Sequence, residues 1–296
     1  AFHIDSIGYH SLYNQGRSIL FIRKQAKGNA LCYGPLAGPY RTIYESAVKK
    51  EPSSFRFDEN RMNGEFTVND SLWYNFSLKN NTCDLIFDRK EIAIPTRMEI
   101  VHANLSRQQK FLTLQIRPLL PKTDKDKQED EPKPDKSFEL ELWTWNEYEV
   151  PTLQTRSRYY RPEYPKYIYD IASKKLTEVA PGHVDLFEPD WAEEIHYVLY
   201  TDETPYRMQK EWLDKVPFDI YAVNVHSGEK KLVGRSYRST PKWSVNGKWA
   251  VMYDPIAKNW NKFDGNTGRV TDISTAIGYP VFDEDYDKPA PAPAYG

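Results

Sequence analysis

A recurring couplet of hairpins constrains the fold of this chain more than any other feature. Residues 240–275 contain two turn signals, Asn246-Gly247 and the stretch from Gly265 to Gly268, each set between alternating apolar and polar residues. An Asn-Gly pair supplies the positive φ angles that a tight hairpin needs. The strand after it, around Trp249 to Tyr253, is apolar on both faces, as expected for a strand packed between two sheets. The segment therefore predicts two consecutive hairpins.

The same couplet occurs four more times along the chain. The other copies cover residues 11–44, 57–87, 105–179 and 190–233. The intervals between the equivalent positions are 48, 45, 85 and 53 residues, taken at Arg17, Glu65, Lys110, Ile195 and Lys248. Three of these intervals lie near the repeat length of propeller blades. We therefore predict an all-β propeller of about five to six four-stranded blades, in a ring that is either closed or incomplete.

The long interval contains a tract of Pro, Lys, Asp and Glu at residues 121–137, which has too few apolar residues to form a core. We predict that it is a solvated loop inserted into a blade, and that a further strand pair forms around residues 138–160. Helical periodicity is weak, and residues 206–216 are the best candidate for one short surface helix. The predicted organisation is one propeller region over 1–296, with the inserted loop at 121–137 and a Pro-rich exit linker at 284–296.

The composition excludes several classes of partner. The chain has 40 basic and 42 acidic residues and a net charge of −2, so no global field attracts nucleic acid. No apolar run approaches the roughly 20 residues of a membrane span. The two cysteines, Cys32 and Cys83, are too few for a disulfide scaffold, and we expect buried free thiols, with a single bridge as the alternative.

Several segments carry a resemblance to a known family. The chain resembles the β-propeller region of bacterial serine peptidases of the prolyl oligopeptidase family, including dipeptidyl-peptidase-like members. Leu140–Gln154 is similar to a Trp-x-Trp segment of that family, and Pro241–Asp254 is similar to its blade turn, with Val245-Asn246 in place of Pro-Asp. Two outer hairpins and the Pro-rich exit are also similar, at 167–179, 219–233 and 280–296.

The resemblance implies a role within a larger peptidase. In that family the propeller caps an α/β-hydrolase domain of the same polypeptide and limits access of peptide substrates to its serine. It also implies a location in the bacterial periplasm or cell envelope. Two alternatives stay open: a free-standing Tol-B-like propeller that binds protein or peptide partners, and a propeller glycosidase or lyase.

The sequence carries little sign of chemistry of its own. The nearest approach to a Gly-x-Ser-x-Gly nucleophile elbow is Gly234–Arg238, where Arg replaces the second glycine, and we expect this segment to join two blades. The six histidines lack zinc-site spacing, and His196 is expected to be a hydrogen-bonded core or interface residue. We therefore predict no catalytic residue, no metal ligand and no cofactor.

The strongest candidate for ligand contact is the segment 143–164, which combines tryptophans and tyrosines with arginines. Such side chains bind peptides through cation–π contacts and hydrogen bonds, although the tryptophans also suit a blade core. In some peptidases of the resembled family, carboxylates of an insertion hold the free amino end of the substrate. The candidate substrate-binding residues are Trp145, Glu147, Glu149, Arg156 and Arg158.

Overall fold

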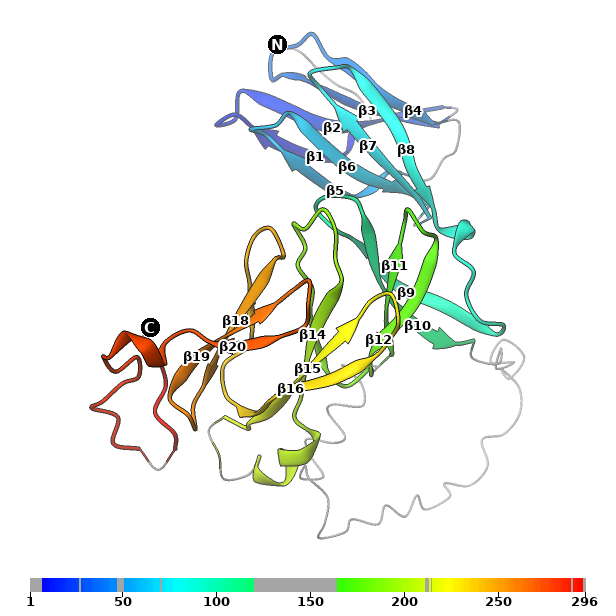
Figure 1. Cartoon of the computed structure of the whole chain (residues 1–296). Coiled ribbons are helices and arrows are strands. Elements are labelled where there is room, and N and C mark those ends of the chain that lie inside the picture. Colours follow the sequence, from blue (N-terminus) through cyan, green and yellow to red (C-terminus); the bar gives the residue numbers. More distant parts are fainter. Residues whose placement is uncertain are drawn as a thin grey trace, which may run out of the picture. The chain divides into compact units, whose positions relative to one another are not determined.

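The computed structural model describes residues 7–26, 28–46, 51–69, 71–119, 164–210, 213, 215–288 and 290–294 (Figure 1). The chain divides into two compact units, Ala1–Ala93 and Ile94–Gly296. The described residues form five four-stranded antiparallel sheets and three short 3-10 helices. In each sheet every strand pairs with its neighbours in the sequence, so that all five are meanders.

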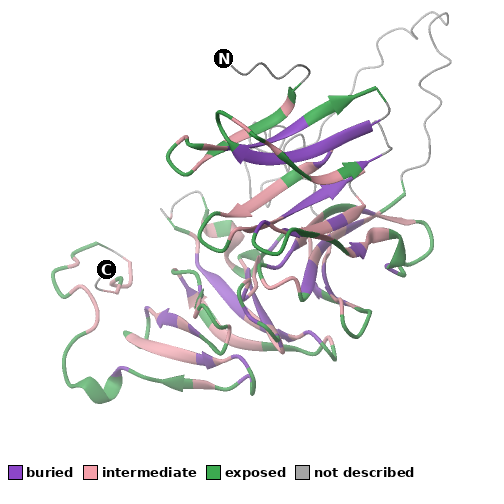
Figure 2. Cartoon of the chain, turned by 90° about the horizontal axis from the view of Figure 1, so that it is seen from above, coloured by how far each residue is buried: buried purple, intermediate pink, exposed green. Residues whose placement is uncertain are grey.

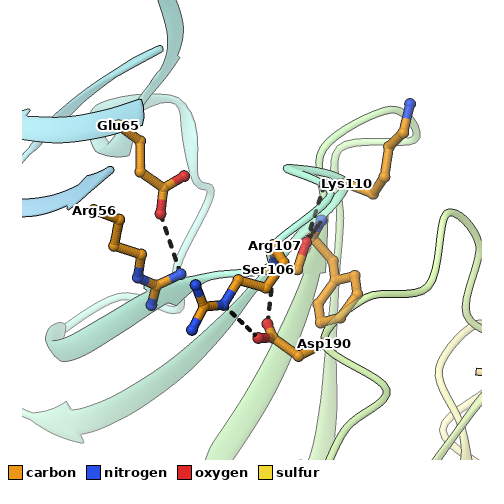
Figure 3. Close-up of polar contacts among 7 residues, drawn as sticks. Arg56, Glu65, Ser106, Arg107, Lys110 and Asp190 are labelled. Carbon is orange, nitrogen blue, oxygen red and sulfur yellow. Dashed lines mark hydrogen bonds and ion pairs between the residues drawn. The ribbon is translucent and has the colours of Figure 1, made fainter. Parts of the chain in front are cut away.

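The first unit holds two of these sheets. The first consists of β1 (Ile7–Tyr13), β2 (Ser18–Gln25), β3 (Gly28–Pro35) and β4 (Arg41–Ser46). The second consists of β5 (Ser53–Asp58), β6 (Asn63–Val68), β7 (Leu72–Ser77) and β8 (Thr82–Asp88), and is followed by the 3-10 helix η1 (Arg89–Glu91). Arg56 and Glu65, directly opposite each other on β5 and β6, form an ion pair of 3.1 Å (Figure 3).

The second unit holds three sheets. Sheet C consists of β9 (Met98–Leu105), β10 (Phe111–Pro118), β11 (Lys166–Asp170) and β12 (Lys175–Ala180). Sheet D consists of β13 (Asp185–Phe187), β14 (Tyr197–Asp202), β15 (Phe218–Asn224) and β16 (Lys230–Tyr237). Sheet E consists of β17 (Lys242–Trp243), β18 (Trp249–Asp254), β19 (Asn259–Asp264) and β20 (Val270–Asp272). The other 3-10 helices are η3 (Thr204–Gln209) and η4 (Thr275–Ile277).

One backbone hydrogen bond identifies the equivalent positions of all five sheets. The N–H of the first residue after the third strand donates to the carbonyl of the last residue before the second strand, at distances of 2.8 to 3.1 Å. The accepting residues are Arg17, Met62, Lys110, His196 and Lys248. The equivalences predicted from sequence were therefore right at Arg17, Lys110 and Lys248, one residue early at Ile195 and three residues late at Glu65.

The strands follow the predicted apolar pattern because each sheet buries side chains against its neighbour within the unit (Figure 2). In the first unit the core between the two sheets includes Leu20, Leu31, Phe66 and Phe76. Sheets C and D of the second unit share a core that includes Phe111, Ile168 and Val198, and sheets D and E share one that includes Leu199, Ile220, Met252 and Phe263. Each fully buried large apolar side chain contributes about 1.5–3 kcal/mol to stability.

Three local features refine the sequence predictions. Gly247 has a φ of 69°, but Asn246 is not among the residues with positive φ, because the connection from β17 to β18 spans residues 244–248 and is wider than a two-residue hairpin. The short helix expected at 206–216 is the 3-10 helix η3, which begins at Thr204; residues 211, 212 and 214 lie outside the described part. Cys32 is a buried free thiol, and Cys83 is a half-buried free thiol.

Over the described ranges, no helix has the length and apolar character to cross a membrane.

Candidate functional site

The five candidate substrate-binding residues belong to a segment outside the described residues. They are Trp145, Glu147, Glu149, Arg156 and Arg158, all within 120–163. The charged loop at 121–137 and the extra strand pair expected around 138–160 fall in the same range. Their placement therefore stays a prediction, and the structure describes only the scaffold from which this insertion leaves.

The insertion leaves sheet C between its second and third strands. β10 and β11, on either side of the insertion, pair directly with each other and without a register shift. At the base, Nε of Arg117 donates to Oε1 of Glu99 at 2.6 Å, and its Nη1 donates to the hydroxyl of Tyr164 at 3.3 Å. The guanidinium also lies 5.7 Å from the centre of the Tyr164 ring. The hydrogen bonds to Tyr164 and Glu99 raise the pKa of Arg117 and keep a cation at this end of β10.

The opposite end of β10 carries a hydrogen-bonded turn, residues 106–110. The buried hydroxyl of Ser106 accepts hydrogen bonds from the backbone N–H groups of Lys110 (3.1 Å) and Phe111 (3.2 Å). Gln109 closes the turn with a φ of 59° and donates its N–H to the Ser106 carbonyl at 2.9 Å. A serine satisfies these donors because its oxygen has two lone pairs and a short reach.

This turn is tied to the loop between β13 and β14 of the next sheet. The N–H of Arg107 donates to the backbone carbonyl of Asp190 at 2.9 Å and to its Oδ1 at 3.2 Å. Nε of Arg107 reaches Oδ2 of Asp190 at 3.3 Å (Figure 3). The guanidinium lies 5.4 Å from the centre of the exposed ring of Trp191. We name Arg107, Asp190 and Trp191 the Arg107 cluster. It presents a cation, a carboxylate and an indole to solvent, a combination suited to polar or peptide ligands.

A titratable carboxyl begins the same loop. Glu188 accepts a hydrogen bond from the Thr113 hydroxyl at 3.2 Å. Although the residue as a whole is half-buried, desolvation of its carboxyl raises the pKa of Glu188, and Asp190 adds to the rise. The Thr113 hydrogen bond and the charge of Lys166 act in the opposite direction. Burial near sheets C and D thus favours the neutral form of the Glu188 carboxyl more than solvent would.

Two histidines lie farther along this end of the second unit. His196 immediately precedes β14, whereas the sequence predicted that it lies inside a strand. Its ring packs edge-on against that of His226, with the two ring centres 5.5 Å apart. Its Nε2 is 3.7 Å from Oε1 of Glu194. His196 is half-buried and lies just before β14, not within the core of the strand. Within the described ranges, no group of three or more His, Cys, Asp or Glu side chains has the arrangement of a metal site.

The segment Gly234–Arg238 has no nucleophile-elbow geometry. Gly234 to Tyr237 belong to β16, the last strand of sheet D, and Ser236 has a φ of 56° within it. The N–H of Ser236 donates to Oδ1 of the buried Asp219 at 3.1 Å, and the Tyr206 hydroxyl donates to the same oxygen at 2.7 Å. An elbow would require a turn between a strand and a helix. The arrangement instead attaches η3 to the sheet.

The Arg107 cluster was not predicted from sequence. The residues that it joins are 83 positions apart, and neither Ser106–Lys110 nor Asp190-Trp191 matches a binding motif. A signal was nevertheless present: Ser106–Lys110 and Ser244–Lys248 share the pattern Ser-x-x-x-Lys before an aromatic residue. Aligning the two turns would have placed Arg107 at the start of a repeated loop.

Repeated four-stranded meanders are the blades of β-propellers, so the predicted all-β propeller class is confirmed at the level of the sheets. No family model and no curated protein sequence matches this chain. Among solved structures it is similar to an oligogalacturonate lyase in complex with manganese, with 10% identity, a TM-score of 0.38, and coverage of 88% of this chain and 63% of the lyase. TolB from Acinetobacter baumannii has 12% identity, a TM-score of 0.29, and coverage of 88% and 53%. The β-propeller domain of the Trilobed protease from Pyrococcus furiosus has 11% identity, a TM-score of 0.31, and coverage of 91% and 71%.

This chain spans 63% of the length of the lyase and 53% of that of TolB, so both proteins extend beyond the matched region. At such identities and TM-scores the likenesses say nothing about activity.

Proposed function

We propose that this chain is the non-catalytic propeller portion of a serine peptidase of the prolyl oligopeptidase family. In this role it orients peptide substrates, and limits their access, for an α/β-hydrolase domain of the same polypeptide. The proposal rests first on the sequence resemblance, above all that of residues 140–154.

The structural observation that supports it best is the attachment of the insertion to sheet C. The segment leaves between two strands that pair in unbroken register, and Arg117, Glu99 and Tyr164 form a bonded base beside it. Recognition residues commonly lie on loops positioned by a rigid scaffold. Sheet C is such a scaffold, and the segment inserted into it includes the aromatic, acidic and basic residues suited to bind a peptide.

In the proposed complex, Glu147 and Glu149 accept hydrogen bonds from the free ammonium group of a peptide. Charge-assisted hydrogen bonds of this kind contribute about 1.5–3 kcal/mol each. Trp145 covers the apolar part of the first side chain, and Arg156 and Arg158 bind peptide carbonyl groups. Access is then restricted to chains that present an unblocked amino end.

The test compares binding of a labelled short peptide with its N-acetylated form, using the full chain. Replacing both carboxylates, Glu147→Gln with Glu149→Gln, should weaken binding of the free peptide at least about 10-fold and leave the acetylated peptide unchanged. The matched control is Glu193→Gln with Glu194→Gln, which removes the same charge from the exposed loop near the Arg107 cluster.

Equal binding of the free and acetylated peptides would contradict the proposed role of the carboxylates. Loss of binding in the control alone would instead place the ligand at the Arg107 cluster. The peptidase assignment has a separate test, the encoded sequence that follows Gly296. It should contain a Gly-x-Ser-x-Gly elbow followed by Asp and His, and a gene product without such a domain would overturn the assignment while leaving peptide binding intact.

A further inference from the structure

The face of sheet E that points away from sheet D carries a pair of aromatic residues. Ala250, Met252 and Phe263 pack toward sheet D. Because side chains alternate along a strand, Tyr253 of β18 faces the other way, and Trp260 of β19 lies directly opposite it. The two ring centres are 5.5 Å apart, and Tyr253 is 2% exposed.

The chain's own C-terminal segment contacts Tyr253 of this pair. The hydroxyl of Tyr253 donates to the backbone carbonyl of Ala292 at 3.1 Å. Ala290, Pro291, Ala292 and Ala294 are half-buried, whereas Pro293 is exposed. In Figure 1 the red C-terminal part of the chain lies on the side of sheet E where β19 is labelled.

Further contacts hold the segment as a closed loop. The N–H of Asp283 donates to the Pro293 carbonyl at 2.9 Å, and Phe282 forms an isolated bridge with Ala294. Nζ of Lys258, in the turn between β18 and β19, lies 4.3 Å from the centre of the Phe282 ring. These contacts fix both arms of the loop without adding a strand to sheet E.

The chemistry of the segment matches that of the surface. Residues 288–294 read Lys-Pro-Ala-Pro-Ala-Pro-Ala. Proline has no N–H and a fixed φ, so an alternating proline segment cannot form a regular strand ladder but stays extended and exposes its carbonyls. Aromatic rings that pack on such a segment, with a hydroxyl that donates to one of its carbonyls, are the usual elements of proline-rich recognition.

We propose that the Tyr253–Trp260 face of sheet E is a binding site for proline-rich polypeptide, and that residues 290–294 of the same chain occupy it. The segment is a strap that covers the sheet by specific recognition. Since the recognised features are carbonyls and proline rings, a detached strap leaves a surface that accepts the same sequence from solution.

The first test measures hydrogen exchange of the Asp283 amide, which the closed strap protects. Tyr253→Phe removes the hydroxyl but keeps the ring, and should speed exchange about 2- to 10-fold through the loss of one hydrogen bond. The matched control is Tyr237→Phe. Tyr237 is equally buried but lies in the core between sheets D and E, where its hydroxyl accepts a hydrogen bond from Asn261. Unchanged exchange in Tyr253→Phe, or an equal rise in both variants, would overturn the proposal.

The second test opens the strap in the full chain. Pro291→Gly with Pro293→Gly loosens the segment by adding backbone freedom to its unbound state. A labelled peptide of residues 286–296 should then bind, as followed by fluorescence anisotropy. It should bind the wild-type chain at least about 10-fold more weakly, because the tethered strap competes at an effective concentration in the millimolar range. A peptide with the same two glycines should bind the opened chain more weakly than the wild-type peptide. Equal binding of both peptides, or no binding to the opened chain, would refute recognition of proline.

Discussion

The turns at residues 106–110 and 244–248 are two copies of one local structure placed in different surroundings. Each turn begins with a serine whose N–H donates to the carbonyl of the aromatic residue five positions later. The distance is 3.0 Å from Ser106 to Phe111 and 2.8 Å from Ser244 to Trp249. The serine hydroxyl accepts from the N–H of that same residue at 3.2 Å in each case. The fourth residue has a positive φ in both turns, 59° at Gln109 and 69° at Gly247.

The turns differ in what surrounds the fourth residue. A Cβ added to Gly247 would lie 2.6 Å from the Cβ of Ala192 and 2.8 Å from that of Pro189. Gln109 occupies the equivalent position with a full side chain, so the turn itself tolerates a Cβ there. The loop between β13 and β14 therefore contacts both turns: Asp190 and Trp191 contact the first, and Pro189 and Ala192 pack on the second. Glycine at 247 is required by packing between sheets rather than by the turn alone.

The largest effect is expected from Gly247→Ala. A side chain at this φ costs about 1–2 kcal/mol, and overpacking against Pro189 and Ala192 adds about 1–3 kcal/mol. Denaturant unfolding followed by circular dichroism measures the loss. Gly278→Ala is the control, because Gly278 has a φ of 74° and no atom within 4 Å of the added Cβ, so only the conformational cost applies. Equal losses in the two variants would show that the packing argument is wrong.

A smaller effect is expected from Ser106→Ala. This change removes the acceptor of two backbone N–H groups at a buried position, which costs about 1–3 kcal/mol. Ser244→Ala removes the equivalent hydroxyl from a half-exposed turn, where water can replace it, and should cost less. Comparing the two denaturation midpoints tests whether burial sets the difference. A larger loss for Ser244→Ala would contradict it.

The smallest effect concerns the pH dependence of stability through Glu188. Since desolvation raises the pKa of Glu188 in the folded state, its contribution to stability is present below the unfolded pKa of about 4.3 and is lost as pH rises through the folded value. Glu188→Gln keeps an acceptor for Thr113 but cannot ionise. The variant should gain stability relative to the wild type as pH rises from about 4 toward neutrality, as seen in thermal unfolding at several pH values. Glu193→Gln, on the exposed part of the same loop, should leave this slope unchanged. A stability difference between Glu188→Gln and the wild type that stays constant across this pH range would show that Glu188 does not cause the pH dependence.

The candidate site was predictable only in part. The sequence predicts a peptide-contact region at 143–164, of which the structure describes only Tyr164, but it did not indicate the Arg107 cluster. Arg107 becomes a candidate only when the loop that carries Asp190 and Trp191 lies beside its turn, and the packing of sheet C on sheet D decides that. Similarly, nothing in the proline-rich segment itself shows that Ala292 accepts a hydrogen bond from Tyr253.

The sequence alone determined the five repeated sheets and the positions of most of their turns. Strand alternation and serine- or glycine-containing turns depend on contacts between residues a few positions apart, so these features can be read along the chain. The tertiary structure decided which turns tolerate a side chain, which charged residues form clusters, and what covers the last sheet. Those outcomes depend on close packing between segments far apart in sequence, where displacements of less than an ångström separate a contact from a clash.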